Sequence, residues 1–166
     1  MSDKRTGAEE GSSVLLPSAL ECLQRYADRS VYSQELYRII STRPDCASLN
    51  PVMANIGRAL DLRSISRVLL LNWGDSALPF FLGSSQIDVE VEPADEDVAE
   101  LVGVQCRPLG RVKTLTASTA DNSSINLCSG VYDLIIARSS TDRDAEETLA
   151  LVKSLMPFVE KAGLLV

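Results

Sequence analysis

The chain has 166 residues, of which 45% are hydrophobic and 23% charged, a composition typical of one globular domain with a core of its own. Its formal net charge of −7 argues against a surface built for nucleic acid or anionic membranes, because such partners usually select a basic face. The complete absence of histidine excludes a histidine general base, a histidine metal ligand and a Ser-His-Asp triad within this chain.

Four cysteines are widely spaced and form no C-x-x-C pair: Cys22, Cys46, Cys106 and Cys128. This spacing supports neither a zinc site nor a disulfide framework, so we expect buried or incidental thiols and no metal. No segment approaches the roughly 20 apolar residues of a membrane-spanning helix, and the N-terminus lacks the apolar core of a secretory signal. We therefore expect a cytoplasmic protein.

The N-terminal part of the chain predicts a polar tail and then helices. Residues 1–13 carry glycines and charges of both signs, which predicts a disordered tail. Leu15–Asp28 and Tyr32–Ile40 place apolar residues at helical spacing. Asn50–Leu62 is the third helix, with Asn50 as the N-cap and Pro51 at the first helical position. Its apolar stripe comprises Val52, Ile56, Ala59 and Leu60.

The stretch Ser66–Leu82 organises the rest of the chain. Its apolar run Val68–Leu71 predicts a strand covered on both faces, as in a parallel sheet. A polar turn follows at Asn72–Ser76, and Ala77–Leu82 predicts a short helix that begins near Pro79. Because open α/β sheets bind ligands at the carboxyl ends of their strands, this turn is the first place to look for a site.

Strands and helices alternate after this turn. Ile87–Glu92 is a predicted strand that ends before Pro93, and Ala94–Val104 is an acidic helix. Arg111–Ala117 alternates as a third strand, Ser118–Gly130 is a polar loop, and Val131–Ala137 is a fourth strand.

The last predicted helix is Asp144–Val159, broken by Gly163 before Leu164–Val166 opens a fifth strand. A strand cut off at its third residue indicates a fragment of a longer protein or a domain with an artificial boundary. The helix is expected to turn four apolar side chains inward: Leu149, Val152, Leu155 and Met156.

This alternation predicts an α/β fold with a doubly wound, mostly parallel sheet and an N-terminal helical layer. The expected organisation is a tail over residues 1–13, a helical cap over residues 14–63, and a Rossmann-like core over residues 64–166 that is incomplete at its C-terminal end.

Four motifs in this order resemble a class I S-adenosylmethionine-dependent methyltransferase domain. They are RVLLLNWGDSALPFFL, then IDVEVEP about twenty residues past the central turn, then YDLIIA, and finally LMPFVEKAGLLV. The resemblance covers about residues 50–166 and implies a Rossmann-like methyltransferase fold with S-adenosylmethionine as the cofactor.

The resemblance also implies a set of cofactor-binding residues. Glu92 matches the acid that bonds the cofactor ribose, and a carboxylate can accept hydrogen bonds from both hydroxyls. Asp121 matches the acid that reaches the adenine amino group. Gly74 matches one loop glycine that lets the backbone approach the ligand, and Asn72 and Asp75 flank it as further candidates. The pair Tyr132–Asp133 matches an aromatic–Asp pair with a mostly structural role.

Each of these residues also has an ordinary structural interpretation. Glu92 could be a solvated strand end, Asp121 a turn residue, and Asp75 the cap of the helix that follows it. The loop reads N-W-G-D-S-A where the family pattern is acidic-x-G-x-G-x-G. Trp73 and Ser76 stand where small residues are usual, and this narrows the methionine pocket.

Two functions from different classes remain open. The chain is a methyltransferase, or its cofactor-binding part, acting on an unidentified acceptor; alternatively, it is an inactive methyltransferase-like scaffold or interaction domain of a larger protein, a pseudo-enzyme. A dinucleotide-binding Rossmann domain has less support because G-x-G-x-x-G is absent. The residues indicate no catalytic group, and a homo-oligomer or the remainder of a larger protein are the partners to consider.

Overall fold

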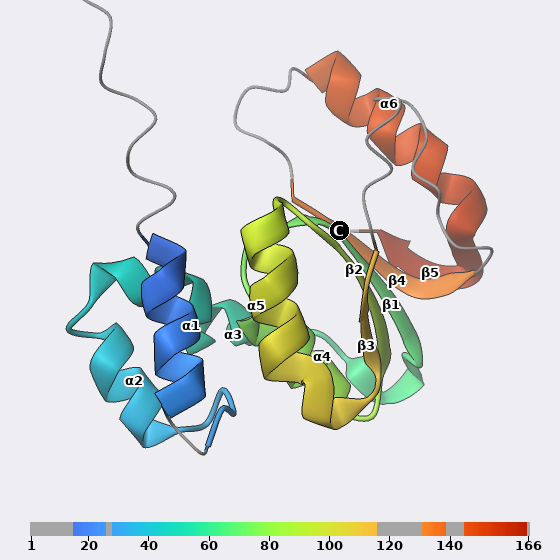
Figure 1. Cartoon of the computed structure of the whole chain (residues 1–166). Helices are drawn as coiled ribbons and strands as arrows, with labels where there is room; N and C mark the ends of the chain where they lie inside the picture. Colours follow the sequence, from blue (N-terminus) through green and yellow to red (C-terminus); the bar gives the residue numbers. More distant parts are fainter. Residues whose placement is uncertain (1–14, 26–27, 116–130, 139–144, 166) are drawn as a thin grey trace, which may run out of the picture.

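The computed structural model describes residues 15–25, 28–115, 131–138 and 145–165 (Figure 1). Asp121 and the loop predicted at 118–130 lie outside these residues, as do Cys128 and the tail 1–13. Within the described part of the chain, none of the helices combines the length and the apolarity that crossing a membrane requires.

A five-stranded sheet forms the centre of the molecule, with the order β3-β2-β1-β4-β5 and every neighbouring pair parallel. The chain builds outward from β1 to β3, then crosses to the other side of β1 for β4 and β5. The prediction of a doubly wound parallel sheet is therefore confirmed, and the switch point lies between β1 and β4. The strands are β1 (Arg67–Trp73), β2 (Asp88–Pro93), β3 (Val112–Thr114), β4 (Tyr132–Ala137) and β5 (Val159–Leu165).

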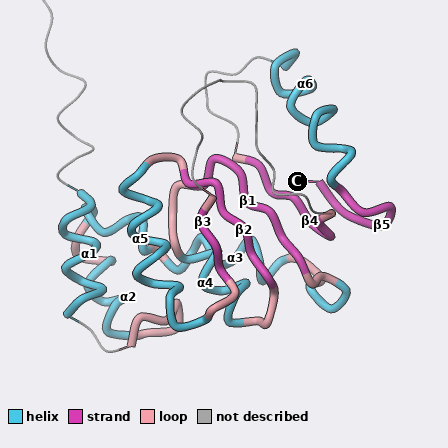
Figure 2. The backbone as a smooth tube through the Cα atoms, turned by 45° about the vertical axis from the view of Figure 1, so that its right-hand side comes forward, coloured by secondary structure: helices cyan, strands magenta, loops and turns pink. Residues whose placement is uncertain are grey.

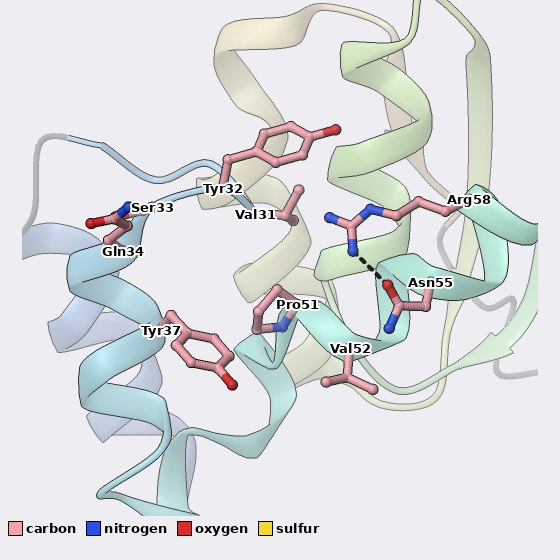
Figure 3. A pocket seen from close by; sticks show the side chains of 9 residues that line it. All are labelled: Val31, Tyr32, Ser33, Gln34, Tyr37, Pro51, Val52, Asn55 and Arg58. Carbon is pink, nitrogen blue, oxygen red and sulfur yellow. Dashed lines mark hydrogen bonds between the residues drawn. The ribbon is translucent and has the colours of Figure 1, made fainter.

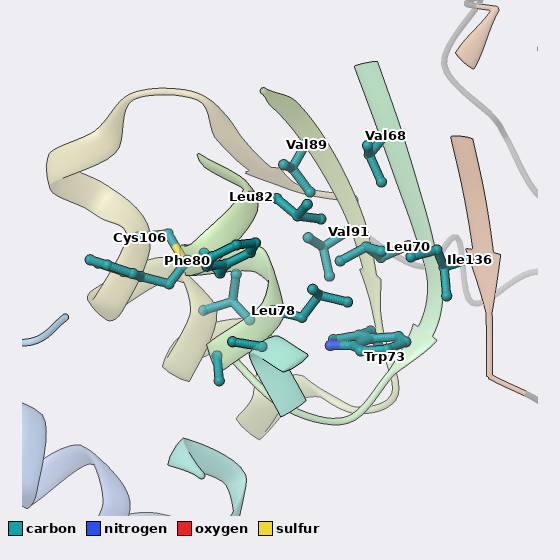
Figure 4. Close-up of a cluster of buried hydrophobic side chains, with 14 of the residues drawn as sticks. Val68, Leu70, Trp73, Leu78, Phe80, Leu82, Val89, Val91, Cys106 and Ile136 are labelled. Carbon is teal, nitrogen blue, oxygen red and sulfur yellow. The ribbon is translucent and has the colours of Figure 1, made fainter. Parts of the chain in front are cut away.

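Helices cover the sheet on its two faces (Figures 1 and 2). On one face α4 (Ala77–Ser84) and α5 (Glu96–Cys106) enclose the largest buried cluster. Figure 4 shows its centre, where Val68 and Leu70 of β1 meet side chains of β2 and α4. On the other face a second cluster joins Leu69 and Leu71 to Leu155 of α6 (Ala145–Leu155). β1 is thus buried on both faces, as its uninterrupted apolar run predicts.

The N-terminal helices are α1 (Leu15–Arg25), α2 (Gln34–Ile40) and α3 (Ala54–Ala59). They form a further layer outside α4 and α5, with α1 against α5 and α3 against α4 (Figures 1 and 2). A third buried cluster holds α1 and α2 against Leu101 of α5. Cys22 and Cys46 are buried in this cluster, and their sulfur atoms lie 3.5 Å apart.

The helix predicted at Asn50–Leu62 is shorter than expected. Asn50 is its cap, because its Oδ1 accepts a hydrogen bond from the Val52 amide at 3.0 Å. A 3-10 turn, Pro51–Met53, precedes α3, and the backbone is extended again at Leu60. The prediction that Val52 and Ala59 face the core is wrong, since both are exposed. The 3-10 turn has about three residues per turn rather than 3.6, so it shifts the side chains out of the predicted α-helical stripe.

Two expectations for the last helix are also wrong. Leu149 and Met156 were expected to point inward but are 52% and 59% exposed, while Leu155 is fully buried. At 3.6 residues per turn, positions seven apart share one side of a helix, and Leu155 lies on a different side. The side of the helix that carries Leu149 and Met156 therefore faces solvent.

The fifth strand is longer than predicted. The helix stops at Leu155, a 3-10 turn containing Pro157 follows, and β5 already begins at Val159. Gly163 lies inside this strand and does not separate it from the helix.

Candidate functional site

The carboxyl end of β1 is shaped by a residue in the left-handed conformation. Asn72 has φ of 51°, and the register between β1 and β2 shifts between Leu70 and Trp73. Asparagine tolerates this conformation better than most residues with a side chain. Its Nδ2 donates a hydrogen bond to the carbonyl oxygen of Arg138 at 3.1 Å. Asn72 therefore joins the ends of β1 and β4 across the switch point.

Gly74 lies beneath the side chain of Arg138. A Cβ at position 74 would come within 2.8 Å of the Arg138 Nη1, so the glycine allows this close approach. Gly74 was predicted to let a ligand approach the backbone closely, and in this structure the group that approaches it is a guanidinium. Because this is the far end of a long side chain, it can move aside or turn toward an anion.

Asp75 is buried and caps the start of α4 from the position before the N-cap residue, Ser76. Its Oδ1 accepts hydrogen bonds from the amides of Ala77, at 3.0 Å, and Leu78, at 3.3 Å. Burial raises the pKa of the Asp75 carboxyl, although these amides and the charge of Arg138 oppose the shift. The structural interpretation of Asp75 as a helix cap is therefore confirmed.

Three buried polar atoms at the start of α4 have no well-formed hydrogen bond within the described residues: Trp73 Nε1, Asp75 Oδ2 and Ser76 Oγ. The indole group favours the ionised carboxylate, but its geometry falls short of a hydrogen bond. Trp73 is only 3% exposed and packs in the large cluster of Figure 4, so it is a core residue.

Glu92 lies at the neighbouring carboxyl end, that of β2. Pro93 pairs with Trp73, and the Ala94 amide donates to the Trp73 carbonyl oxygen at 2.8 Å. Glu92 is therefore one residue from the point where β2 meets the loop of β1. Its side chain is half-buried, and among the described residues it has neither a hydrogen bond nor an ion pair. It is an acceptor left open at this edge of the sheet.

Glu90 is a buried acid that the sequence interpretation missed. Its Oε2 accepts from the Tyr132 hydroxyl at 2.6 Å and its Oε1 from Nη2 of Arg67 at 2.8 Å. Arg67 also lies over the Tyr132 ring, 4.9 Å from its centre. Burial alone would raise the pKa of Glu90, but these two hydrogen bonds and the Arg67 charge outweigh it and lower the pKa. The sequence did contain a signal for Glu90: an acidic residue in the middle of a strand that is covered on both faces needs hydrogen-bond or charge partners.

Asp133 is also used by the fold. Its Oδ2 accepts from the backbone amides of Ser66, at 2.7 Å, and Arg67, at 2.9 Å. It thereby anchors the start of β1 to β4, in agreement with the structural role that the resemblance implies.

The structure thus brings four predicted site residues to one edge of the sheet: Asn72 at the end of β1, Gly74 and Asp75 on the loop after it, and Glu92 at the end of β2. It adds Arg138, whose guanidinium lies beside Gly74. The fifth predicted residue, Asp121, lies outside the described residues.

Solved structures with a similar fold include S-adenosylmethionine-dependent methyltransferases. The enzyme from Thiobacillus denitrificans, in complex with S-adenosylhomocysteine, is 18% identical with a TM-score of 0.52, over 90% of this chain and 53% of that one. Coclaurine N-methyltransferase, bound to N-methylheliamine and S-adenosylhomocysteine, is 16% identical with a TM-score of 0.55. The match covers 97% of this chain and 51% of that one. The plantazolicin methyltransferase BpumL, in complex with S-adenosylhomocysteine, is 12% identical with a TM-score of 0.53. The match covers 92% of this chain and 60% of that one.

The fold is that of the class I methyltransferases. This chain spans about half the length of the methyltransferases that it matches. No protein-family model matches the sequence, and no curated protein matches it. Identities below a fifth show a shared fold, and function has to be argued from the site itself.

Proposed function

We infer that this chain is the S-adenosylmethionine-binding part of a methyltransferase. The observation that carries this proposal is the Glu92 carboxylate, which is half-buried at the carboxyl end of β2 and has no partner among the described residues. The structures with this fold that are quoted above contain S-adenosylhomocysteine, the demethylated form of that cofactor.

The donor set of this edge fits the cofactor chemically. A carboxylate can accept hydrogen bonds from two adjacent ribose hydroxyls, and partial burial reduces competition from water. Gly74 lets a ligand approach the backbone, and the Arg138 guanidinium beside it can pair with the carboxylate of a methionine group. The bound cofactor would supply the methyl group, and the protein would hold it in line with an acceptor.

The acceptor belongs to the same proposal, and its class stays open between a small molecule and a macromolecule. The net charge of −7 argues against nucleic acid. We propose no catalytic base, because methyl transfer can rely largely on orientation.

Calorimetric titration of S-adenosylmethionine and S-adenosylhomocysteine tests this proposal. We expect micromolar binding, about −8 kcal/mol. Glu92→Gln should weaken it by about 10-fold or more, because it removes charge-assisted hydrogen bonds. The matched control is Glu100→Gln, the same change on the exposed side of α5. Equal affinities for the wild type and Glu92→Gln would refute the role of Glu92.

A second candidate function is an inactive scaffold. The observation that favours it is the Arg138 guanidinium over Gly74, together with a loop that retains one glycine. Under this proposal the wild type binds neither ligand at millimolar concentration, and Arg138→Ala does not restore binding. Binding that appears only in Arg138→Ala would instead show a cofactor site that this side chain covers.

A further inference from the structure

A surface hollow lies between α2 and the segment Pro51–Arg58, in the N-terminal layer (Figure 3). Its volume is about 530 Å³, within the range of roughly 300–1,000 Å³ that is usual for small-molecule sites. Nine residues line it, and none of them belongs to the edge that carries Glu92. It is therefore a different site from the proposed cofactor site.

Arg58 is the charged residue of this lining. In Figure 3 its guanidinium points from α3 into the hollow, and its Nη1 donates to Asn55 Oδ1 at 2.5 Å. Among the residues that the structure describes, no acid pairs with it. Four of its five N–H donors therefore remain for another acceptor.

Two aromatic rings flank this guanidinium. Its central carbon lies 5.5 Å from the centre of the Tyr32 ring and 5.5 Å from that of Phe81. The N–H groups of a guanidinium lie at the edge of its plane, where they suit the two oxygens of a carboxylate. Contact with the two rings orders the side chain before any ligand arrives, which lowers the entropic cost of binding.

Exposed apolar side chains surround the cation. Within the described residues six large hydrophobic side chains are exposed, and three of these line the hollow: Tyr32 at 60%, Tyr37 at 57% and Val52 at 54%. In Figure 3 Tyr37 lies across from Arg58, with Pro51 between them. Exposed apolar side chains that lie next to one another are typical of ligand-binding and interaction surfaces. Their flat faces favour a planar, apolar ligand body.

We propose that this hollow binds a small planar aromatic carboxylate, with Arg58 pairing with the carboxylate and Tyr32 and Tyr37 contacting the ring. The volume exceeds that of a simple inorganic anion, and the lining offers apolar contact that such an anion cannot use. The lining contains no acid that would repel the ligand. This site is independent of the proposed cofactor site and does not rest on the proposed function.

The test is a titration of the full chain with 2-naphthoate, followed by NMR of the backbone amides. Saturable shifts are expected in residues 31–37 and 51–58, with a Kd of about 0.1–1 mM. Uncharged 2-naphthamide should bind at least about 10-fold more weakly, because it cannot form the bidentate ion pair. Equal binding of acid and amide would overturn the role of the cation.

Three variants locate the effect. Arg58→Gln should weaken 2-naphthoate binding by about 10-fold or more, and Tyr37→Ala by several-fold. The control, Arg63→Gln, removes the same charge from a side chain that is 90% exposed and should leave affinity within about two-fold. A native amide spectrum for Arg58→Gln shows that the variant is folded. No saturable binding to the wild type up to about 5 mM, or shifts confined to other residues, contradicts the proposal.

Discussion

The carboxyl ends of β1 and β2 lie side by side but use their polar residues differently. At the end of β1, Asn72 bonds to the Arg138 backbone and Asp75 caps α4. At the end of β2, Glu92 has no described partner. Polar groups that the fold already uses contribute to stability, whereas a group left open can contribute to ligand binding. The polar groups of the first end thus serve the fold, and the second end offers the proposed cofactor site a hydrogen-bond acceptor.

The contrast recurs within β2 itself. Glu90 and Glu92 are two residues apart and share one face of the strand, since side chains alternate. Glu90 is 8% exposed and holds Arg67 and Tyr132, while Glu92 holds neither. Identical side chains on one face of one strand therefore have different expected costs of substitution.

The largest expected effect is at the end of β1. Trp73→Ala should lower the free energy of unfolding by about 3–5 kcal/mol, because it removes a large side chain that is 3% exposed in the core. Glu92→Ala should change it by less than about 0.5 kcal/mol. Urea denaturation of both variants measures the difference. Similar losses at the two positions would remove the contrast between the two ends.

Next comes the pair within β2. Glu90→Ala should lower the free energy of unfolding by about 1–3 kcal/mol, since it leaves the buried Tyr132 hydroxyl and the partly buried Arg67 without their acceptor. Glu92→Ala is again the reference. If both alanine variants unfold at the same urea concentration, the hydrogen bonds of Glu90 do not stabilise the fold.

A smaller effect is expected at Asp75. Asp75→Ala should cost about 1 kcal/mol by removing the cap of α4. Asp75→Asn keeps an oxygen acceptor and removes a buried charge. Burial raises the pKa of this carboxyl, so ionisation opposes folding at neutral pH. We therefore expect Asp75→Asn to be at least as stable as the wild type at pH 7, and an equal loss in both variants would contradict this.

The smallest effect is in the acid range and concerns Glu90. Its folded pKa lies below the ordinary value of 4.5. Its contribution to stability is therefore fully present above about pH 4.5 and is lost as the pH falls through the lower, folded pKa. Glu90→Gln should flatten this part of the stability curve.

Asp61→Asn is the control for this pH effect. Its carboxyl also has a lowered pKa, through the hydrogen bond from Arg63, but the pair is exposed and screened by solvent. Thermal unfolding between pH 3 and 6 compares the three proteins. A curve for Glu90→Gln that parallels the wild type would show that the lowered pKa does not support folding.

Much of the fold could be predicted because it depends on neighbours in the sequence. The run Val68–Leu71 predicts β1 through its continuous apolarity, and Asn50 followed by Pro51 predicts a capped helix start. The order of motifs predicts the methyltransferase fold. The same local patterns failed for Val52, Leu149 and Met156, because periodicity shows that a helix has sides but not how it is turned against its neighbours.

The sequence by itself determined the parallel sheet, the loop after β1 and the presence of an acid near the end of β2. Only the tertiary structure decided that Glu90 is held by Arg67 and Tyr132, that Arg138 covers Gly74, and that Arg58 lies over the Tyr32 ring beside an open hollow. Hydrophobic periodicity and helix caps depend on residues that are close in the sequence, so they can be predicted from the sequence alone. In contrast, Glu90 is 23 residues from Arg67 and 42 residues from Tyr132 in the sequence, and only the folded chain brings such distant groups together.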